Sequence, residues 1–185
     1  IPGYGWEVKI VDERGDAVAL GEVGELCVKG PGVMTCYYRD PKATAEVLKD
    51  GWLYTGDMAK QDDEGFIYLV DRKEDVIISG GENIYPVQIE DFLHGHEAVK
   101  DVAVIGLPDR RLGEISAAII ECKPGFSCSE EEINAYCRQL PRYKRPHKII
   151  FADVPRNATG KIEKPKLRHI YRSENLVAAQ TEADQ

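Results

Sequence analysis

Up to about residue 70, the apolar positions recur in short runs that are separated by polar, turn-forming stretches such as Glu13-Arg14-Gly15-Asp16. Short runs rich in β-branched and aromatic residues predict strands. We expect these strands at Trp6–Val11, Glu25–Lys29 and Phe66–Val70. One short helix should interrupt them, because Pro41 suits a first helical position and Thr44–Leu48 tolerate a helix. The first part of the chain is therefore predicted to be rich in β-structure.

After the charged stretch Asp71-Arg72-Lys73-Glu74-Asp75, the pattern changes to alternating strands and helices. We place a domain boundary there, between residues 72 and 73. A strand at Val76–Ser79 and a Gly80-Gly81 break should precede a helix that is entered at Pro86. In that helix, the i, i+3, i+4 spacing of three apolar residues predicts one buried face. These residues are Ile89, Phe92 and Leu93.

The rest of the second part predicts a hairpin, a helix, a strand and a last helix. The hairpin joins Val102–Leu107 to Ile115–Glu121 through a polar tip. Ser129 and Glu132 have the spacing of a capping box, which opens a helix through Leu140 with the core face Ile133, Tyr136, Cys137 and Leu140. A strand at His147–Phe151, a turn at 155–160 and a helix from about Pro165 complete an α+β fold. Residues 73–172 form this domain, and residues 173–185 are expected to be a disordered tail.

Charge and cysteine content narrow the function classes. The 185 residues carry 24 Lys+Arg against 32 Asp+Glu, a net charge of −8, which argues against binding nucleic acid polymers. No run approaches the roughly 18 apolar residues of a membrane span. The five cysteines form no C-x-x-C pair, which favours a reduced, cytoplasmic setting. The chain begins at Ile1 without an initiator Met, so we expect it to be part of a longer protein.

His94 and His96 do not predict a metal site, since positions two apart on a helix point roughly 200° apart. We expect no metal ligands on these residues.

Three stretches of the sequence contain residue patterns that the fold alone does not require, and they are candidate functional motifs. Tyr54-Thr55-Gly56-Asp57 places a carboxylate at the end of a short strand, although a simple Asx-type turn would use the same residues. Asp71–Asp75 form a charged joint beside a glycine loop. Pro155–Lys161 form a tight turn that presents a cation, and they are not a Walker P-loop because the first Gly of that motif is absent.

Taken in order, these motifs resemble the adenylate-forming superfamily of acyl-CoA synthetases, peptide-synthetase adenylation domains and luciferases. The resemblance covers nearly the whole chain. It rests on Gly51–Asp57, Gly65–Ile67 with Asp71-Arg72, Ile78–Pro86 and Gly160-Lys161. The form Gly-Gly-Glu-Asn-Ile-Tyr-Pro is most similar to fatty-acid and other carboxylic acid CoA ligases. By this resemblance, residues 1–72 end the large N-terminal AMP-binding domain and residues 73–172 are the mobile C-terminal lid.

The resemblance also implies residue roles. Asp57 would bind both ribose hydroxyls of ATP, and charge-assisted bonds of this kind are worth about 1.5–3 kcal/mol each. Arg72 would reach the nucleotide, and Glu74 would be the hinge of the lid. Lys161 would enter the active site for the first half-reaction, where a lysine about 4 Å from developing charge contributes about 4 kcal/mol at an effective dielectric near 20.

For the second half-reaction, the resemblance places Gly81 beside the pantetheine tunnel, and Tyr143 and Arg145 at the CoA nucleotide. For that last segment, a helix C-terminus that collects cations is an equally good interpretation. The implied substrates are ATP, CoA and a small-molecule carboxylic acid, with Mg²⁺ held by residues upstream. A lysine acetyltransferase acting on Lys161 would remove the charge that the first step needs.

The leading hypothesis is therefore part of an AMP-forming acid–CoA ligase that makes an acyl-adenylate and then an acyl-CoA, and the fragment alone is expected to be inactive. Two alternatives stay open at this point. One is an adenylation domain that loads a carrier protein, and the other is a non-catalytic α+β binding module.

Overall fold

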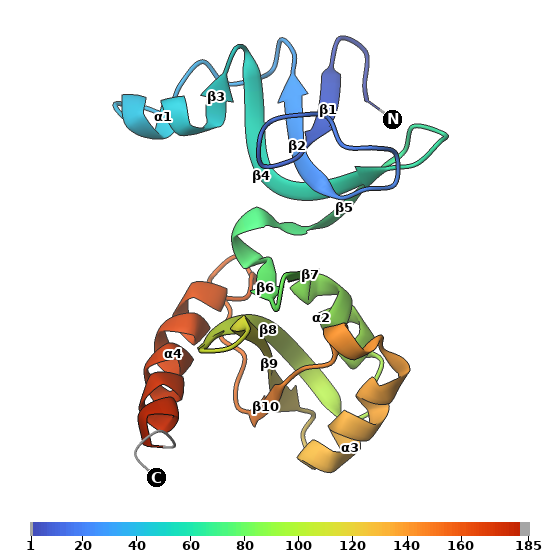
Figure 1. Ribbon diagram of the computed structural model, residues 1–185, viewed down its shortest axis with the longest axis vertical. Coiled ribbons are helices and arrows are strands. Elements are labelled where there is room, and N and C mark those ends of the chain that lie inside the picture. Colours follow the sequence, from blue (N-terminus) through green and yellow to red (C-terminus); the bar gives the residue numbers. More distant parts are fainter. Residues whose placement is uncertain (1, 182–185) are drawn as a thin grey trace. The chain divides into compact units, whose positions relative to one another are not determined.

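The structure is a computed structural model that describes residues 2–181, with side chains for residues 2–172. The chain divides after Glu74 into two compact units, and each unit is described here by itself (Figure 1). The sequence places this boundary two residues earlier. Both units mix helices with small sheets, so the predicted α+β class is confirmed.

The first unit is built on an antiparallel five-stranded sheet. Its long strand β4 pairs with β2, β3 and β5, and β1 pairs with β2. The elements are β1 (Glu7–Val11), β2 (Gly24–Lys29), α1 (Pro41–Val47), β3 (Leu48–Lys49), β4 (Trp52–Gln61) and β5 (Ile67–Arg72). α1 begins as predicted at Pro41, and the Asp40 side chain caps it by accepting a hydrogen bond of 2.9 Å from the Ala43 N–H.

The second unit is a sheet with helices on both faces (Figure 1). β9 is central and pairs antiparallel with β8 and β6 and parallel with β10. Its strands are β6 (Ile77–Ser79), β7 (Glu82–Ile84), β8 (Val99–Asp109), β9 (Gly113–Cys122) and β10 (Lys148–Phe151). Its helices are α2 (Pro86–His94), α3 (Glu130–Tyr136) and α4 (Lys164–Thr181), with 3₁₀ turns at Cys137–Gln139 and Arg142–Lys144, and a further 3₁₀ turn, Lys73–Asp75, spans the boundary between the units.

Alternation along β8 explains the two cores of this unit. Val102 and Val104 pack with α2 and α3 on one face, whereas Ala103 and Ile105 pack with Leu167 of α4 on the other. Successive strand residues point to opposite faces, so a strand that is covered on both sides reads as one continuous apolar run. The predicted helix face is confirmed in α2, where Ile89 and Leu93 are buried and Phe92 is partly buried against the same core.

The structure differs from the sequence expectations at three elements. The sequence predicts a break at Gly80-Gly81 but no strand after it; these two glycines have positive φ and form the two-residue turn of a hairpin between β6 and the unpredicted strand β7. The capping box at Ser129 is confirmed, but the α-helix ends at Tyr136 and continues only as a 3₁₀ turn. α4 continues to Thr181, across most of the expected tail, because Leu, Ala and Gln favour a helix there; residues 182–185 lie outside the described residues.

No helix within residues 2–181 combines the length and apolar character needed to cross a membrane.

A buried ion pair joins α2 to the start of α4. Glu90 and Lys164 lie 2.9 Å apart, and the side chain of each is 10% exposed. Glu90 also accepts a hydrogen bond of 2.7 Å from the Val104 N–H. Removal of one partner from a buried pair leaves an uncompensated charge, which costs about 3–5 kcal/mol.

We predict that Glu90→Gln lowers the stability of the second unit by about 3 kcal/mol, the lower end of this range, because Lys164 loses its nearest anion and keeps only Asp75, 3.9 Å away. Amide hydrogen exchange along β8 measures this, since the tryptophans, Trp6 and Trp52, both lie in the first unit. Glu163→Gln is the matched control. It breaks an exposed pair with Lys166, which is worth only about 0.5 kcal/mol. Equal exchange in the two variants would contradict the prediction.

Candidate functional site

The Thr55-Gly56-Asp57 motif forms a bulge inside β4. Glu25 of β2 lies opposite Met58 and Cys27 lies opposite Tyr54, so three residues of β4 face only Leu26. Gly56 has φ +73°, a backbone conformation that favours glycine. The Thr55 hydroxyl donates to the Leu26 carbonyl (2.8 Å) and accepts from the Asp57 N–H (3.1 Å). Asp57 therefore lies within a long strand and not at the end of a short one, and the turn is closed by Thr55 in place of an Asx side chain.

A buried carboxylate holds this bulge. The Glu25 side chain is 11% exposed, accepts a hydrogen bond of 3.2 Å from the Gly56 N–H and lies 2.7 Å from the Lys73 ammonium. Unpaired backbone donors are costly once buried, so the carboxylate replaces the ladder partner that the bulge removes. The Glu25 side chain thus fixes both the bulge and Lys73, the residue that precedes Glu74.

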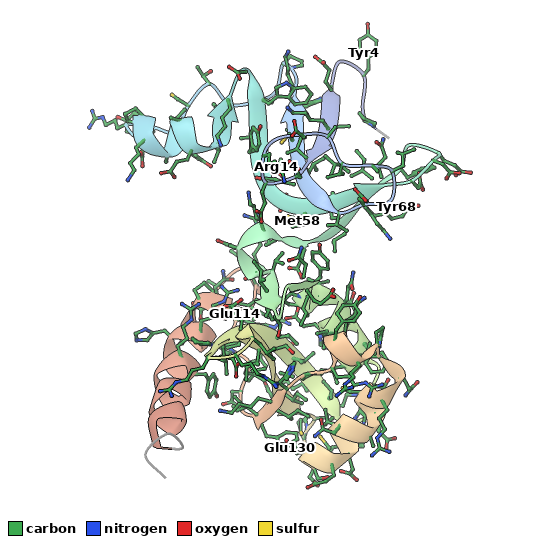
Figure 2. All side chains as sticks on the ribbon, viewed as in Figure 1. Tyr4, Arg14, Met58, Tyr68, Glu114 and Glu130 are labelled. Carbon is green, nitrogen blue, oxygen red and sulfur yellow. The ribbon has the colours of Figure 1, made fainter. Side chains whose placement is uncertain are left out.

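Asp57 and Arg72 are brought together by strand pairing. They are register partners on β4 and β5, and Arg72 Nη1 donates to Asp57 Oδ1 over 2.8 Å. Met58, marked in Figure 2, is the next residue of β4 after Asp57. Asp57 remains 31% and Arg72 55% exposed, so both can also contact a ligand. Beside them is a cavity of about 410 Å³, lined in part by Thr55, Gly56, Arg72 and Lys73. A volume of this order suits a small-molecule ligand.

Glu74 separates two anchored neighbours. Lys73 is paired with Glu25 inside the first unit, and Asp75 is paired with Arg168 of α4 inside the second. Glu74 itself is exposed and has no side-chain partner among the described residues. The side chains on either side of Glu74 are therefore paired within different units, whereas the side chain of Glu74 is not.

Lys161 lies at the end of a loop between β10 and α4 that is closed by its own hydrogen bonds. The Asn157 side-chain oxygen accepts from the Thr159 N–H (3.0 Å), the Thr159 hydroxyl (2.7 Å) and the Lys161 N–H (3.0 Å). The Asn157 N–H also donates to the Lys161 carbonyl over 2.9 Å. Gly160 takes φ +82° to complete the turn. The Lys161 side chain is exposed, and within residues 2–172 it has no partner.

Gly81 and Tyr143 lie on neighbouring elements of the second unit. β7, which follows Gly81, contacts the 3₁₀ turn Arg142–Lys144. Gly81 has φ +88°, and no atom lies within 4 Å of the position that a Cβ would take. Tyr143 is 44% exposed. Arg145 is committed locally, because its guanidinium donates to the carbonyls of Leu140 (3.0 Å) and Arg138 (2.8 Å). This geometry favours the capping interpretation for Arg145.

The structure therefore joins Asp57 to Arg72 in the first unit, and Gly81 to the turn of Tyr143 in the second. Sequence reasoning missed the residues that hold these groups. Glu25 is an acidic residue in the predicted strand Glu25–Lys29, and a carboxylate in a strand that otherwise predicts burial was the available signal.

Comparison with known proteins identifies the family. Residues 88–161 match the AMP-binding enzyme C-terminal domain, and residues 1–38 match the AMP-binding enzyme family. The chain belongs to the adenylate-forming superfamily of AMP-binding enzymes.

Its relatives include a long-chain-fatty-acid–CoA ligase of Bacillus subtilis (strain 168), which is 46% identical over 158 residues, or 84% of this chain and 28% of the relative. ATP-bound MatB from Rhodopseudomonas palustris has a TM-score of 0.85 at 35% identity, and the match covers 91% of this chain and 34% of MatB. O-succinylbenzoate CoA synthetase (MenE) from Bacillus subtilis, in complex with ATP and magnesium, has a TM-score of 0.81 at 39% identity over 91% of this chain and 34% of MenE. The chain thus spans about a third of the length of these proteins.

We predict that Asn157→Ala speeds amide hydrogen exchange at Thr159 and Lys161 about fivefold, because each amide loses an acceptor worth about 1 kcal/mol. Asn134→Ala is the control, since Asn134 is an exposed residue of α3 whose side chain has no partner among the described residues. If the two variants exchange alike at residue 161, the Asn157 side chain does not order the loop.

Proposed function

We propose that this chain is the C-terminal part of an AMP-forming carboxylic acid–CoA ligase. In the first step, the acid carboxylate attacks the α-phosphorus of ATP, and the products are acyl-adenylate and pyrophosphate. In the second step, the CoA thiol attacks the acyl carbon, AMP leaves and the thiol loses its proton. The observation that carries the proposal is the Asp57–Arg72 pair at the bulge beside the cavity, together with an unpaired Lys161 on a closed loop.

Asp57 would bind the ribose of ATP. Its Oδ1 is used by Arg72, whereas Oδ2 has no partner among the described residues and is available to accept hydrogen bonds from hydroxyls. Arg72 would both orient Asp57 and contact the nucleotide. These roles need only hydrogen bonds and charge, which the geometry supplies without rearrangement of the bulge.

ATP would arrive with Mg²⁺, as in the MenE complex. The described residues contain no group of three or more His, Cys, Asp or Glu side chains placed to hold a metal ion. From the resemblance, we propose that the magnesium ligand lies in another part of the longer protein. The ion would neutralise phosphate charge, and Lys161 would stabilise the charge that develops on the transferring group.

CoA would approach the β6–β7 hairpin, where Gly81 leaves room for a thiol arm, and Tyr143 would stack on the adenine. Arg145 would hold the Tyr143 turn in place and offer its remaining donors to phosphate. The named relatives act on different acids, a fatty acid and succinylbenzoate, so we propose a carboxylic acid without assigning its chain length.

We also place the protein in the reducing cytoplasm. The five cysteines are free thiols, and burial raises the pKa of the Cys27 thiol to about 11.

Lys161 is exposed, so a lysine acetyltransferase could reach it and switch off the first step by removing its charge.

We predict that Lys161→Ala, in the longer protein, slows pyrophosphate exchange about a thousandfold, since about 4 kcal/mol of charge stabilisation is lost. Thioester formation from supplied acyl-adenylate and CoA should be retained. Lys42→Ala, at an exposed residue of α1, is the control for loss of a surface cation. Equal loss in both half-reactions would remove the role assigned to Lys161.

Gly81→Leu should do the reverse, because the new side chain fills the path of the thiol arm: pyrophosphate exchange should persist and acyl-CoA formation should fall at least tenfold. Gly81→Ala carries the same backbone strain with little bulk. Gly125→Leu is a matched control, because Gly125 also has positive φ (+79°) and open space around its Cβ position. If Gly125→Leu impairs thioester formation as much, strain and not occlusion explains the effect.

A carrier protein that outcompetes CoA as the acyl acceptor would instead support the alternative function, an enzyme that loads a carrier protein.

A further inference from the structure

A single guanidinium connects the Lys161 loop to the central sheet of the second unit. Arg156 Nε lies 2.6 Å from Asp101 Oδ2, and Nη2 lies 2.8 Å from Oδ1. The third nitrogen, Nη1, donates to the Gly160 carbonyl over 2.5 Å. Asp101 belongs to β8, so Arg156 binds a fixed strand on one side and the residue before Lys161 on the other.

Asp101 is built to hold this cation. Its side chain is 11% exposed; it also accepts from the Val102 N–H over 3.0 Å, and His94 Nε2 lies 3.8 Å away. Burial by itself would raise the pKa of the Asp101 carboxyl, but the hydrogen bonds from Arg156 and Val102 outweigh burial and hold the pKa below its usual range. The same pair raises the pKa of Arg156. The pair therefore stays ionised at neutral pH.

The loop is thus closed from within by Asn157 and fastened from outside by Arg156. The Lys161 side chain is long and exposed, so its placement depends on the position of its backbone. A displacement of about 1 Å in a catalytic group can slow a reaction about a hundredfold. Only arginine can make the two parallel bonds to Asp101 and reach Gly160 with the third nitrogen, because its fork is planar and fixed.

We propose that Arg156 and Asp101 are positioning residues for Lys161 in the adenylation step. The proposal rests on the proposed function, because Lys161 is the group whose position they set. Neither residue touches substrate; both act through the loop.

The first experiment needs no activity and uses the 185-residue chain. In Arg156→Gln and in Asp101→Asn, amide exchange at residues 157–161 should rise at least tenfold, while exchange in the β8–β9 ladder stays within twofold. Lys166→Gln, which breaks an exposed ion pair of α4, should leave the loop unchanged. Unchanged exchange in the loop of both variants would overturn the proposal. Equally faster exchange throughout the second unit would overturn it too, because the pair would then serve only general stability.

The second experiment uses the longer protein. Arg156→Gln should slow pyrophosphate exchange ten- to a hundredfold at saturating ATP, with the KM for ATP within threefold and thioester formation from supplied acyl-adenylate within twofold. Arg156→Lys keeps the charge and loses the fork, so it should recover only part of the rate.

A double variant tests whether Arg156 acts through Lys161. In a Lys161→Ala background, Arg156→Gln should cause no further loss. A full additional loss, or equal loss in both half-reactions, would overturn the positioning role. If Lys161→Ala alone left pyrophosphate exchange intact, the proposed function would fail instead, and the exchange experiment would still report whether the loop is anchored.

Discussion

A carboxylate that is removed from water must be paired, and three of the four buried acidic residues among the described residues are paired with a cation from a distant part of the chain. Glu25, Glu90 and Asp101 lie in or against the sheets, and each is about nine-tenths buried. An unpaired buried charge costs several kcal/mol, so each one constrains the position of a cation from elsewhere in the chain. Those cations are Lys73, Lys164 and Arg156. Two of the three lie in segments that carry the candidate chemistry, so one constraint links stability to function.

This constraint explains how short, polar segments keep a defined position. The loop 156–161 is exposed along its whole length and cannot be ordered by packing. Side chains that reach a strand take over that task, as Arg156 does through Asp101. Ion pairs also fix the two residues that flank Glu74. Lys73 is paired within the first unit, and Asp75 is paired within the second. Glu74 is the one residue of this 3₁₀ turn without such a pair among the described side chains, and the hinge role that the resemblance implies for it stays a prediction.

The local part of this organisation was predictable from the sequence. Periodicity, Pro41 and Pro86 at first helical positions and the Ser129 capping box located most elements, because these signals act within one turn or strand. The resemblance supplied the candidate roles of Asp57, Arg72 and Lys161, and these roles stay predictions. The supporting contacts were not predictable, since their partners lie 48 residues apart for Glu25–Lys73 and 55 for Asp101–Arg156. The bulge in β4 and the commitment of Arg145 also depend on such non-local partners.

In the second unit, the side chains of Arg145 and Arg156 make structural hydrogen bonds, whereas the Lys161 side chain makes none among the described residues. The guanidinium groups of Arg145 and Arg156 donate hydrogen bonds to carbonyls and to a carboxylate, where several donors in a fixed geometry are needed at once. Lys161 has a compact charge and, among the described side chains, no partner. A cation already in a pair must break that pair before it can stabilise a transferring phosphoryl group, and the cost is subtracted from catalysis. An unpaired lysine on an anchored turn avoids this cost, so the arginine pairs and the free lysine are two parts of one arrangement.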